Sequence, residues 1–122
     1  MLSETGKRTE ETLLNHLHAF ASGDVDAIMA DYHEDAVFIT PEGTLRGSGE
    51  IRPLFESLVA DLPPGSALEV SQQIIEGEIA YLVWSGESEK LKIPFATDTL
   101  IVRDGKIVAQ TFAAQMETKP SA

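Results

Sequence analysis

The stretch that decides the fold is TDTLIVRDGKIV, residues 97–108. Alternating apolar residues lead into an Asp-Gly pair and resume after it, which predicts two antiparallel strands joined by a two-residue type I′ turn. Pairing Arg103 with Lys106 across the turn sets the register of the hairpin. This register makes Asp98 the cross-strand partner of Thr111, on a face that is otherwise apolar. A carboxylate among inward-facing apolar side chains requires a structural or functional reason.

Length, charge and residue types limit what the chain can be. Its 122 residues suffice for one domain, expected over residues 1–122 with an ordered part of about 9–116. The absence of cysteine excludes disulfides and thiolate chemistry. A net charge of −11 argues against nucleic acid and anionic membranes as partners. The polar N-terminus and the lack of a spanning apolar run indicate a cytoplasmic protein.

The order of the expected elements is helical first and then all strand. Apolar spacing predicts helices over residues 9–21 and 25–32 and a third helix starting at Gly47-Ser48. Strands are expected at 36–40, 68–75, 79–87, 93–103 and 106–116, with residues 1–8 and 117–122 as loose ends. Three helices followed by an antiparallel meander is an α+β order.

Both faces of the expected sheet are substantially apolar. The face away from the helices is predicted to carry Trp84, Thr97, Ile101, Val108, Gln110 and Phe112. Because an exposed face of this kind favours association, we expect a homodimer formed through it.

Several short motifs occur in a recognisable order. A helix is followed by Ser-Gly-Asp at 22–24, a short helix, His-Glu-Asp-Ala-Val at 33–37, a glycine turn, a helix, and a meander containing Arg-Asp-Gly-Lys-Ile at 103–107. Over about residues 10–116 this order resembles the nuclear transport factor 2-like superfamily, and most of all its SnoaL-like branch. The resemblance implies three N-terminal helices on a strongly curved antiparallel or mixed sheet, closed into a cone with a pocket. Enzymes, binding proteins and assembly modules share this fold.

The layout also resembles ketosteroid isomerase, whose site positions can be transferred by spacing. The resemblance places the isomerase tyrosine position on His16, the proton-shuttling base on Thr40 and the oxyanion aspartate on Asp98. Threonine cannot replace a carboxylate base near neutral pH, so steroid isomerisation by the family mechanism is not expected. SnoaL-like cyclases use an acid/base aspartate, sometimes with a neighbouring histidine, which implies Asp98 and His16 as the catalytic pair.

Structural roles compete with these assignments. Three roles are open for Asp98. The first is a buried acid or base with a raised pKa, and the second is a structural carboxylate bonded to Thr111, His16 or backbone. The third is a group at a solvated pocket mouth. As a neutral acid Asp98 could donate a hydrogen bond to a ligand carbonyl. His16 on an apolar helix face is either a core residue or the partner of Asp98. The spacing of the histidines His16, His18 and His33 does not match a metal site, and we expect neither metal nor cofactor.

The resulting hypothesis is a pocket for a small apolar or cyclic molecule. The leading version is a cofactor-free isomerase, cyclase or hydrolase that works by acid–base catalysis. The alternatives are a non-catalytic ligand-binding protein and a dimeric assembly module. The residues expected to contact the ligand are Phe20, Tyr32, Phe38, Thr40, Phe55, Leu58, Tyr81, Val83, Leu100 and Thr111.

Overall fold

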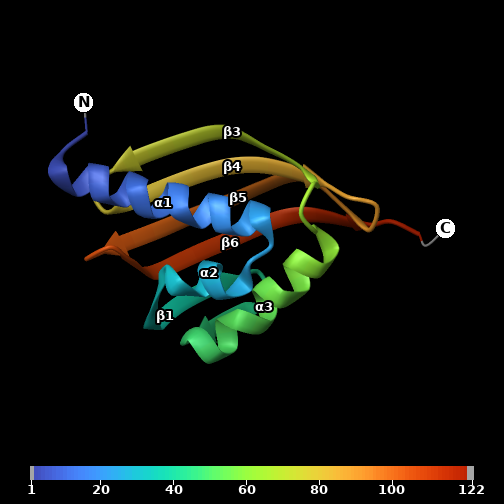
Figure 1. Ribbon diagram of the computed structural model, residues 1–122, viewed down its shortest axis with the longest axis horizontal. Coiled ribbons are helices and arrows are strands. Elements are labelled where there is room, and N and C mark those ends of the chain that lie inside the picture. Colours follow the sequence, from blue (N-terminus) through green and yellow to red (C-terminus); the bar gives the residue numbers. More distant parts are fainter. Residues whose placement is uncertain (1, 121–122) are drawn as a thin grey trace.

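The computed structural model describes residues 2–120, in which three helices lie against one face of a six-stranded sheet (Figure 1). The sheet is mixed, because β1 and β6 are parallel whereas the other neighbours are antiparallel. The strand order is β2-β1-β6-β5-β4-β3, so β2 and β3 are the edges. This arrangement confirms the α+β class. The elements are α1 (Glu4–Ser22), α2 (Val25–Ala30), β1 (Tyr32–Thr40), β2 (Gly43–Arg46), α3 (Ser48–Asp61), β3 (Ala67–Glu76), β4 (Ile79–Glu87), β5 (Leu91–Arg103) and β6 (Lys106–Thr118).

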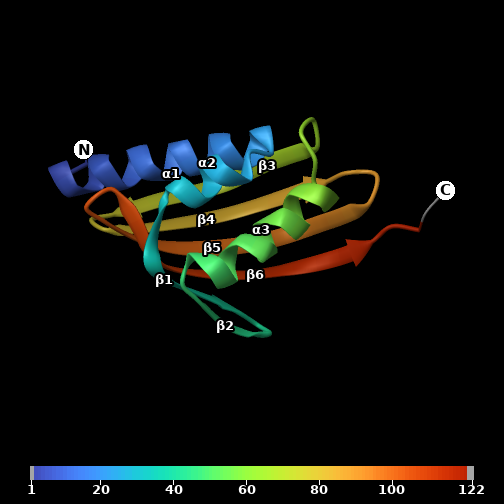
Figure 2. The ribbon, with the colours of Figure 1, turned by 60° about the horizontal axis from the view of Figure 1, so that its bottom comes forward.

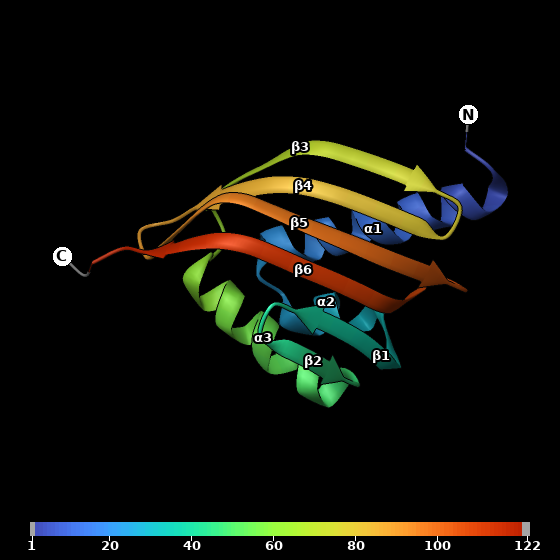
Figure 3. The same ribbon diagram turned by 180° about the vertical axis from the view of Figure 1, so that it is seen from behind.

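The helices form one layer and the curved sheet forms the other. Figure 2 shows α1 and α3 lying over the strands, and Figure 3 shows the opposite face of the sheet without a helix in front of it. The core lies between the two layers, and its fully buried side chains include Leu13, Ile28, Phe38, Ile51, Leu100 and Ile107. Within residues 2–120, no helix is long and apolar enough to cross a membrane.

Helix α1 begins five residues earlier than the apolar pattern indicates. The Ser3 side chain accepts a hydrogen bond from the Gly6 amide and caps the helix. Further along, the Thr9 hydroxyl donates to the Gly77 carbonyl oxygen at 2.6 Å, tying this end of the helix to the β3–β4 turn. The expectation of a loose segment is therefore wrong from Glu4 onward, and Met1 lies outside the described residues.

Strand pairing explains the other differences in element boundaries. The second helix ends at Ala30 rather than at residue 32, because Tyr32 pairs with Ile107 and opens β1. The short strand β2 pairs with β1 and occupies a segment expected to be only a turn. Strand β6 continues to Thr118, which pairs with β5, so the expected loose tail begins later. Residues 121–122 of that tail lie outside the described residues.

The β5–β6 hairpin has the predicted turn but not the predicted register. Asp104 and Gly105 both have positive φ, as a type I′ turn requires. After Val102 pairs with Ile107, however, the register shifts by one residue, and Ile101 pairs with Ala109. This β-bulge leaves one extra residue in β6.

The bulge exchanges the two faces of β6 relative to β5. Asp98 now pairs with Phe112, and Leu100 pairs with Gln110, so Thr111 is exposed on the outer face. The prediction that Gln110 and Phe112 lie on the outer face is wrong for this reason. On β4 the same prediction fails for Trp84, which lies on the helix-covered face.

Candidate active site

A partly open cavity of about 230 Å³ lies between the helices and the sheet. Its walls are apolar except for His16, Glu69, Asp98 and Gln110. Typical pockets for drug-sized ligands have volumes of ~300–1,000 Å³, so this cavity suits a smaller molecule. The remaining lining residues are Leu17, Phe20, Ala21, Phe38, Phe55, Leu58, Leu68, Val70, Leu82, Trp84, Leu100 and Phe112.

Asp98 lies on the sheet wall of the cavity and is 7% exposed. Strand alternation turns it inward together with Leu100, which is fully buried. Its Oδ1 accepts a hydrogen bond from the Trp84 indole Nε1 at 2.7 Å, and its Oδ2 accepts one from Gln110 Nε2 at 2.7 Å. Both donors are neutral, so the carboxylate is hydrogen-bonded without a cation beside it.

Burial raises the pKa of Asp98 from 3.8 to about 6, because a carboxylate loses solvation among apolar side chains. The hydrogen bonds from Trp84 and Gln110 oppose this effect, since they stabilise the ionised form. At neutral pH the group is therefore mainly a carboxylate, and it takes up a proton in mildly acidic solution. A group that changes protonation near neutral pH is suited to proton transfer.

A hydrogen-bonded chain continues behind Asp98. The Tyr32 hydroxyl donates to Gln110 Oε1, and Gln110 Nε2 donates to Asp98. Burial, reinforced by the charges of Asp98 and Asp31, raises the pKa of Tyr32 well above its ordinary value, so the phenol remains a proton donor. The chain orients the Gln110 amide and thereby the donor that holds Asp98.

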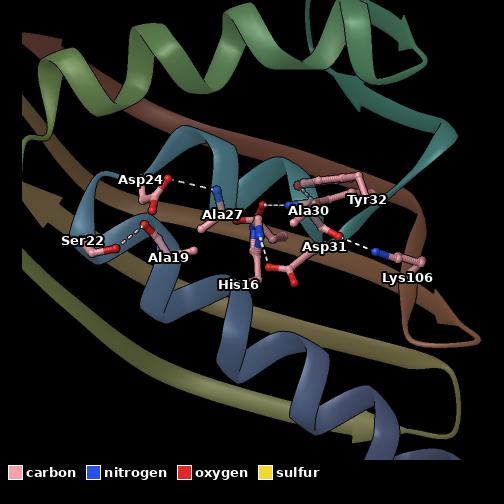
Figure 4. A network of polar contacts seen from close by, with 11 residues as sticks. His16, Ala19, Ser22, Asp24, Ala27, Ala30, Asp31, Tyr32 and Lys106 are labelled. Carbon is pink, nitrogen blue, oxygen red and sulfur yellow. Dashed lines mark hydrogen bonds and ion pairs between the residues drawn. The ribbon is translucent and has the colours of Figure 1, made fainter.

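His16 projects from α1 into the same cavity wall and is 6% exposed. Its ring packs edge-on against Tyr32 and Phe55, at centroid distances of 5.5 and 5.7 Å. Burial lowers the pKa of His16 from 6.5 to about 4, which makes the imidazole neutral at physiological pH. Its nearest ionisable neighbour is Asp31, with 3.8 Å between His16 Nδ1 and Asp31 Oδ2 (Figure 4).

The family of the chain follows from its sequence profile. The profile of the SnoaL-like domain matches residues 13–110, which include the cavity-lining parts of α1, α3 and β3 to β5. The chain belongs to the SnoaL-like domain family.

Solved structures confirm the fold of this SnoaL-like domain. A protein proposed to be a ketosteroid isomerase, from Kribbella flavida DSM 17836, has a TM-score of 0.74 at 14% identity, covering 95% of this chain and 84% of that chain. A SnoaL-like protein of unknown function from Burkholderia thailandensis E264 has a TM-score of 0.72 at 14% identity, covering 89% and 95%. TerC co-crystallised with polyporic acid has a TM-score of 0.70 at 20% identity, covering 88% and 92%. Among curated proteins none matches the sequence.

The SnoaL-like domain brings about half of the expected contact residues to the cavity. Asp98 and His16 both line it, but no hydrogen bond joins them among the described residues. Tyr32 lies one step behind the lining, bonded to Gln110. The expected contact residues that do line the cavity are Phe20, Phe38, Phe55, Leu58 and Leu100.

Four expected contact residues lie elsewhere. Tyr81 and Val83 lie on the outer face, because the buried residues of β4 are the alternate ones, Ala80 and Leu82. Thr111 is turned outward by the bulge in β6. Thr40 ends β1, and its hydroxyl accepts a hydrogen bond from the Glu42 amide in the β1–β2 turn, so it does not line the cavity.

Three polar residues of the site were not anticipated. Trp84 and Gln110 donate to Asp98, and Asp31 faces His16. An indole N–H inside a protein needs an acceptor, so the single tryptophan of the sequence could have been predicted to donate to a buried carboxylate. Gln110 was obscured by the bulge, and Asp31 by the expectation that the second helix continues through it.

Replacing Trp84 with phenylalanine tests the hydrogen bond to Asp98. The Trp84→Phe variant keeps an aromatic ring but removes the Nε1 donor, so we expect the pKa of Asp98 to rise above about 6. Titration of the carboxyl carbon of Asp98 by NMR measures this change. A matched control is Phe20→Leu, which alters an aromatic lining residue without touching a hydrogen bond. An unchanged pKa in Trp84→Phe would mean that the indole does not stabilise the carboxylate.

Metal ligation has no support in the described residues. Within residues 2–120, no three histidine or carboxylate side chains converge as a metal-binding group. His16 and Asp31 form only a pair.

Proposed function

We propose that this SnoaL-like domain binds a small apolar or cyclic molecule and catalyses proton transfer on it, as a cofactor-free isomerase or cyclase. The observation that carries the proposal is Asp98, a cavity-lining carboxyl group whose pKa of about 6 lies near working pH. Above this pKa the ionised group acts as a general base. The similarity to a protein proposed to be a ketosteroid isomerase and to TerC supports a ligand cavity in this fold.

In the proposed reaction, Asp98 removes a proton from an acidic carbon and returns it at another position. Trp84 and Gln110 hold the two oxygens of the carboxylate, so its plane is fixed before a ligand enters. Neutral His16 supplies a polar contact on the helix side of the cavity. The apolar walls leave the carboxylate poorly solvated, which raises its basicity toward the ligand.

Proton exchange of 2-tetralone in D₂O tests this proposal. This small bicyclic ketone has acidic C–H groups, so a general base in the cavity should accelerate their replacement by deuterium. We expect the rate to rise with pH and to level off above about 6, following ionisation of Asp98. The acceleration should be lost in Asp98→Asn and retained in Asp35→Asn, which changes an exposed carboxylate. Equal exchange rates in wild type and Asp98→Asn would leave ligand binding without proton transfer as the function.

We also propose that the domain forms a homodimer through the outer face of its sheet. No helix covers this face in the described residues (Figure 3), and Ile39 and Ile74 are each 47% exposed there. Thr99 lies near its centre, paired with Tyr81 on one side and Thr111 on the other. An uncovered sheet face with exposed apolar side chains favours association with a second copy of the chain.

Sedimentation of a Thr99→Arg variant checks the dimer. Arginine in the middle of the interface would bury an unpaired charge, so we expect the wild type at twice the protomer mass and the variant at the protomer mass. Lys106→Arg, at the exposed β5–β6 turn, serves as the control. A monomeric wild type at micromolar concentration would contradict the proposed dimer.

A further inference from the structure

Two buried polar atoms in the site lack a hydrogen-bond partner, and they face each other. They are Nδ1 of His16 and Oδ2 of Asp31, separated by 3.8 Å. Among residues 2–120 these are the buried side-chain nitrogen and oxygen atoms that no hydrogen bond satisfies. Because leaving such atoms unpaired is costly, a small movement that brings them to hydrogen-bond distance with a proton between them would satisfy both.

The charges around the pair decide which atom holds this proton. Asp31 is 16% exposed at its side chain, and the Lys106 ammonium beside it opposes the rise in pKa that burial causes. The Lys106 ammonium favours the ionised form of Asp31, and this form can only accept a hydrogen bond. Neutral His16 carries one ring proton, and the position that Asp31 stabilises is Nδ1.

The opposite edge of the imidazole is then a bare acceptor. Nδ1 is fully buried. Nε2 makes no hydrogen bond within residues 2–120 and is not among the fully buried atoms. Since His16 lines the cavity, Nε2 is the nitrogen available to a ligand. The two acidic side chains on the wall, Asp98 and Glu69, are also acceptors when ionised.

We propose that Asp31 is a positioning residue that holds His16 in its Nδ1–H form, so that Nε2 accepts a hydrogen bond and the cavity selects a ligand with a hydroxyl group. The selectivity part rests on the proposed function, because it assumes that a ligand occupies the cavity beside Asp98. The expected ligand is thus a hydroxylated ring compound that offers an acidic proton to Asp98 and an O–H to His16.

The tautomer of His16 is measurable without any ligand. Long-range ¹H–¹⁵N NMR of the labelled protein at about pH 8, above the ordinary histidine pKa of ~6.5, should show His16 protonated on Nδ1. His33 provides an internal contrast, because its Nδ1 accepts from the Asp35 amide at 3.0 Å and its proton must be on Nε2. Asp31→Leu should convert His16 to the Nε2–H form, whereas His18→Gln on the exposed side of α1 should not.

Ligand selectivity is tested with matched pairs of probes. These are the 6- and 7-hydroxy-2-tetralones and the corresponding methoxy compounds, with the indole N–H signal of Trp84 as the binding readout, since Trp84 is the single tryptophan of the chain. A methoxy oxygen cannot donate to Nε2. We expect at least one hydroxy compound to bind about tenfold more tightly than its methoxy partner. The preference should disappear in His16→Phe and in Asp31→Leu.

The outcomes separate this inference from the proposed function. His16 protonated on Nε2 in the wild type, or equal binding of hydroxy and methoxy probes, would overturn the inference even if Asp98 accelerates proton exchange of 2-tetralone. Conversely, the Nδ1–H form with no proton exchange would support the positioning role of Asp31 and remove the general-base proposal. If no tetralone binds, the ligand preference is contradicted, and the tautomer measurement decides the role of Asp31.

Discussion

We expect the Asp98→Asn variant to gain stability relative to the wild type as the pH rises. Its free energy of unfolding minus that of the wild type should be about 3 kcal/mol larger at pH 8 than at very low pH. The folded-state pKa of Asp98, about 6, lies above the unfolded value of 3.8. The native state therefore binds the proton more tightly, and this contribution to stability is lost as the pH rises through 6. An asparagine amide is never ionised and avoids the loss.

Local hydrogen bonding supports a folded variant. The new amide oxygen can accept from Trp84, and the Gln110 amide can turn over so that its oxygen accepts from the new NH₂ group. Urea unfolding of both proteins between pH 3.5 and pH 8 measures the difference in the free energy of unfolding. Asp35→Asn is the matched control at an exposed site. A stability difference that is constant across this range would show that burial does not raise the pKa of Asp98.

The His16→Gln variant is expected to show the opposite dependence on pH. The folded-state pKa of His16, about 4, lies below the unfolded value of 6.5, so the wild type loses about 3 kcal/mol from this group as the pH falls from 8 to 4. Glutamine does not titrate, and the variant should lose no stability from this position. The free energy of unfolding of the variant relative to the wild type should therefore improve by about this amount in acid.

Packing losses in His16→Gln are independent of pH and do not obscure the test. The variant loses edge-on contacts with Tyr32 and Phe55, which lowers its stability equally at every pH. His18→Gln, at an exposed position of the same helix, should follow the wild type. The same dependence on pH in His16→Gln and His18→Gln would show that burial does not lower the pKa of His16 in the folded protein.

The contributions of these two groups to wild-type stability nearly cancel between pH 4 and pH 6.5. Over this range His16 adds stability as the pH rises, and Asp98 removes a similar amount. The two single variants should therefore differ from the wild type in opposite directions as the pH changes. The ionisable groups that face them are Asp31, which lies near His16, and Tyr32, whose phenol stays neutral.

The fold could be predicted from the sequence because its strongest signals are local. The Asp104-Gly105 turn and the alternation of β5 before it depend on neighbours in the chain, and both predictions were correct. Errors arose where distant pairing decides the structure. Tyr32 follows directly after a helix and is a strand residue only because Ile107, 75 positions later, lies beside it.

The site could be predicted only in part, for a related reason. Asp98 keeps its inward position because the bulge is in β6 and leaves the alternation of β5 intact. Its hydrogen-bond partners depend on the register of β6. The extra residue in β6 turns Gln110 toward Asp98 and turns Thr111, the expected partner, to the outer face. The pattern of apolar residues could not indicate the extra residue, because both faces of β6 carry apolar side chains.

The position of β3 has a consequence for the rate at which ligands enter and leave. Leu68 and Val70 line the cavity, yet they lie on a strand that pairs only with β4. Strands at a sheet edge open locally at a lower free-energy cost than central strands. We therefore expect ligand residence time to follow the opening of β3, so that a mutation in this strand can change exchange kinetics while the affinity-determining groups on β5 and α1 stay in place.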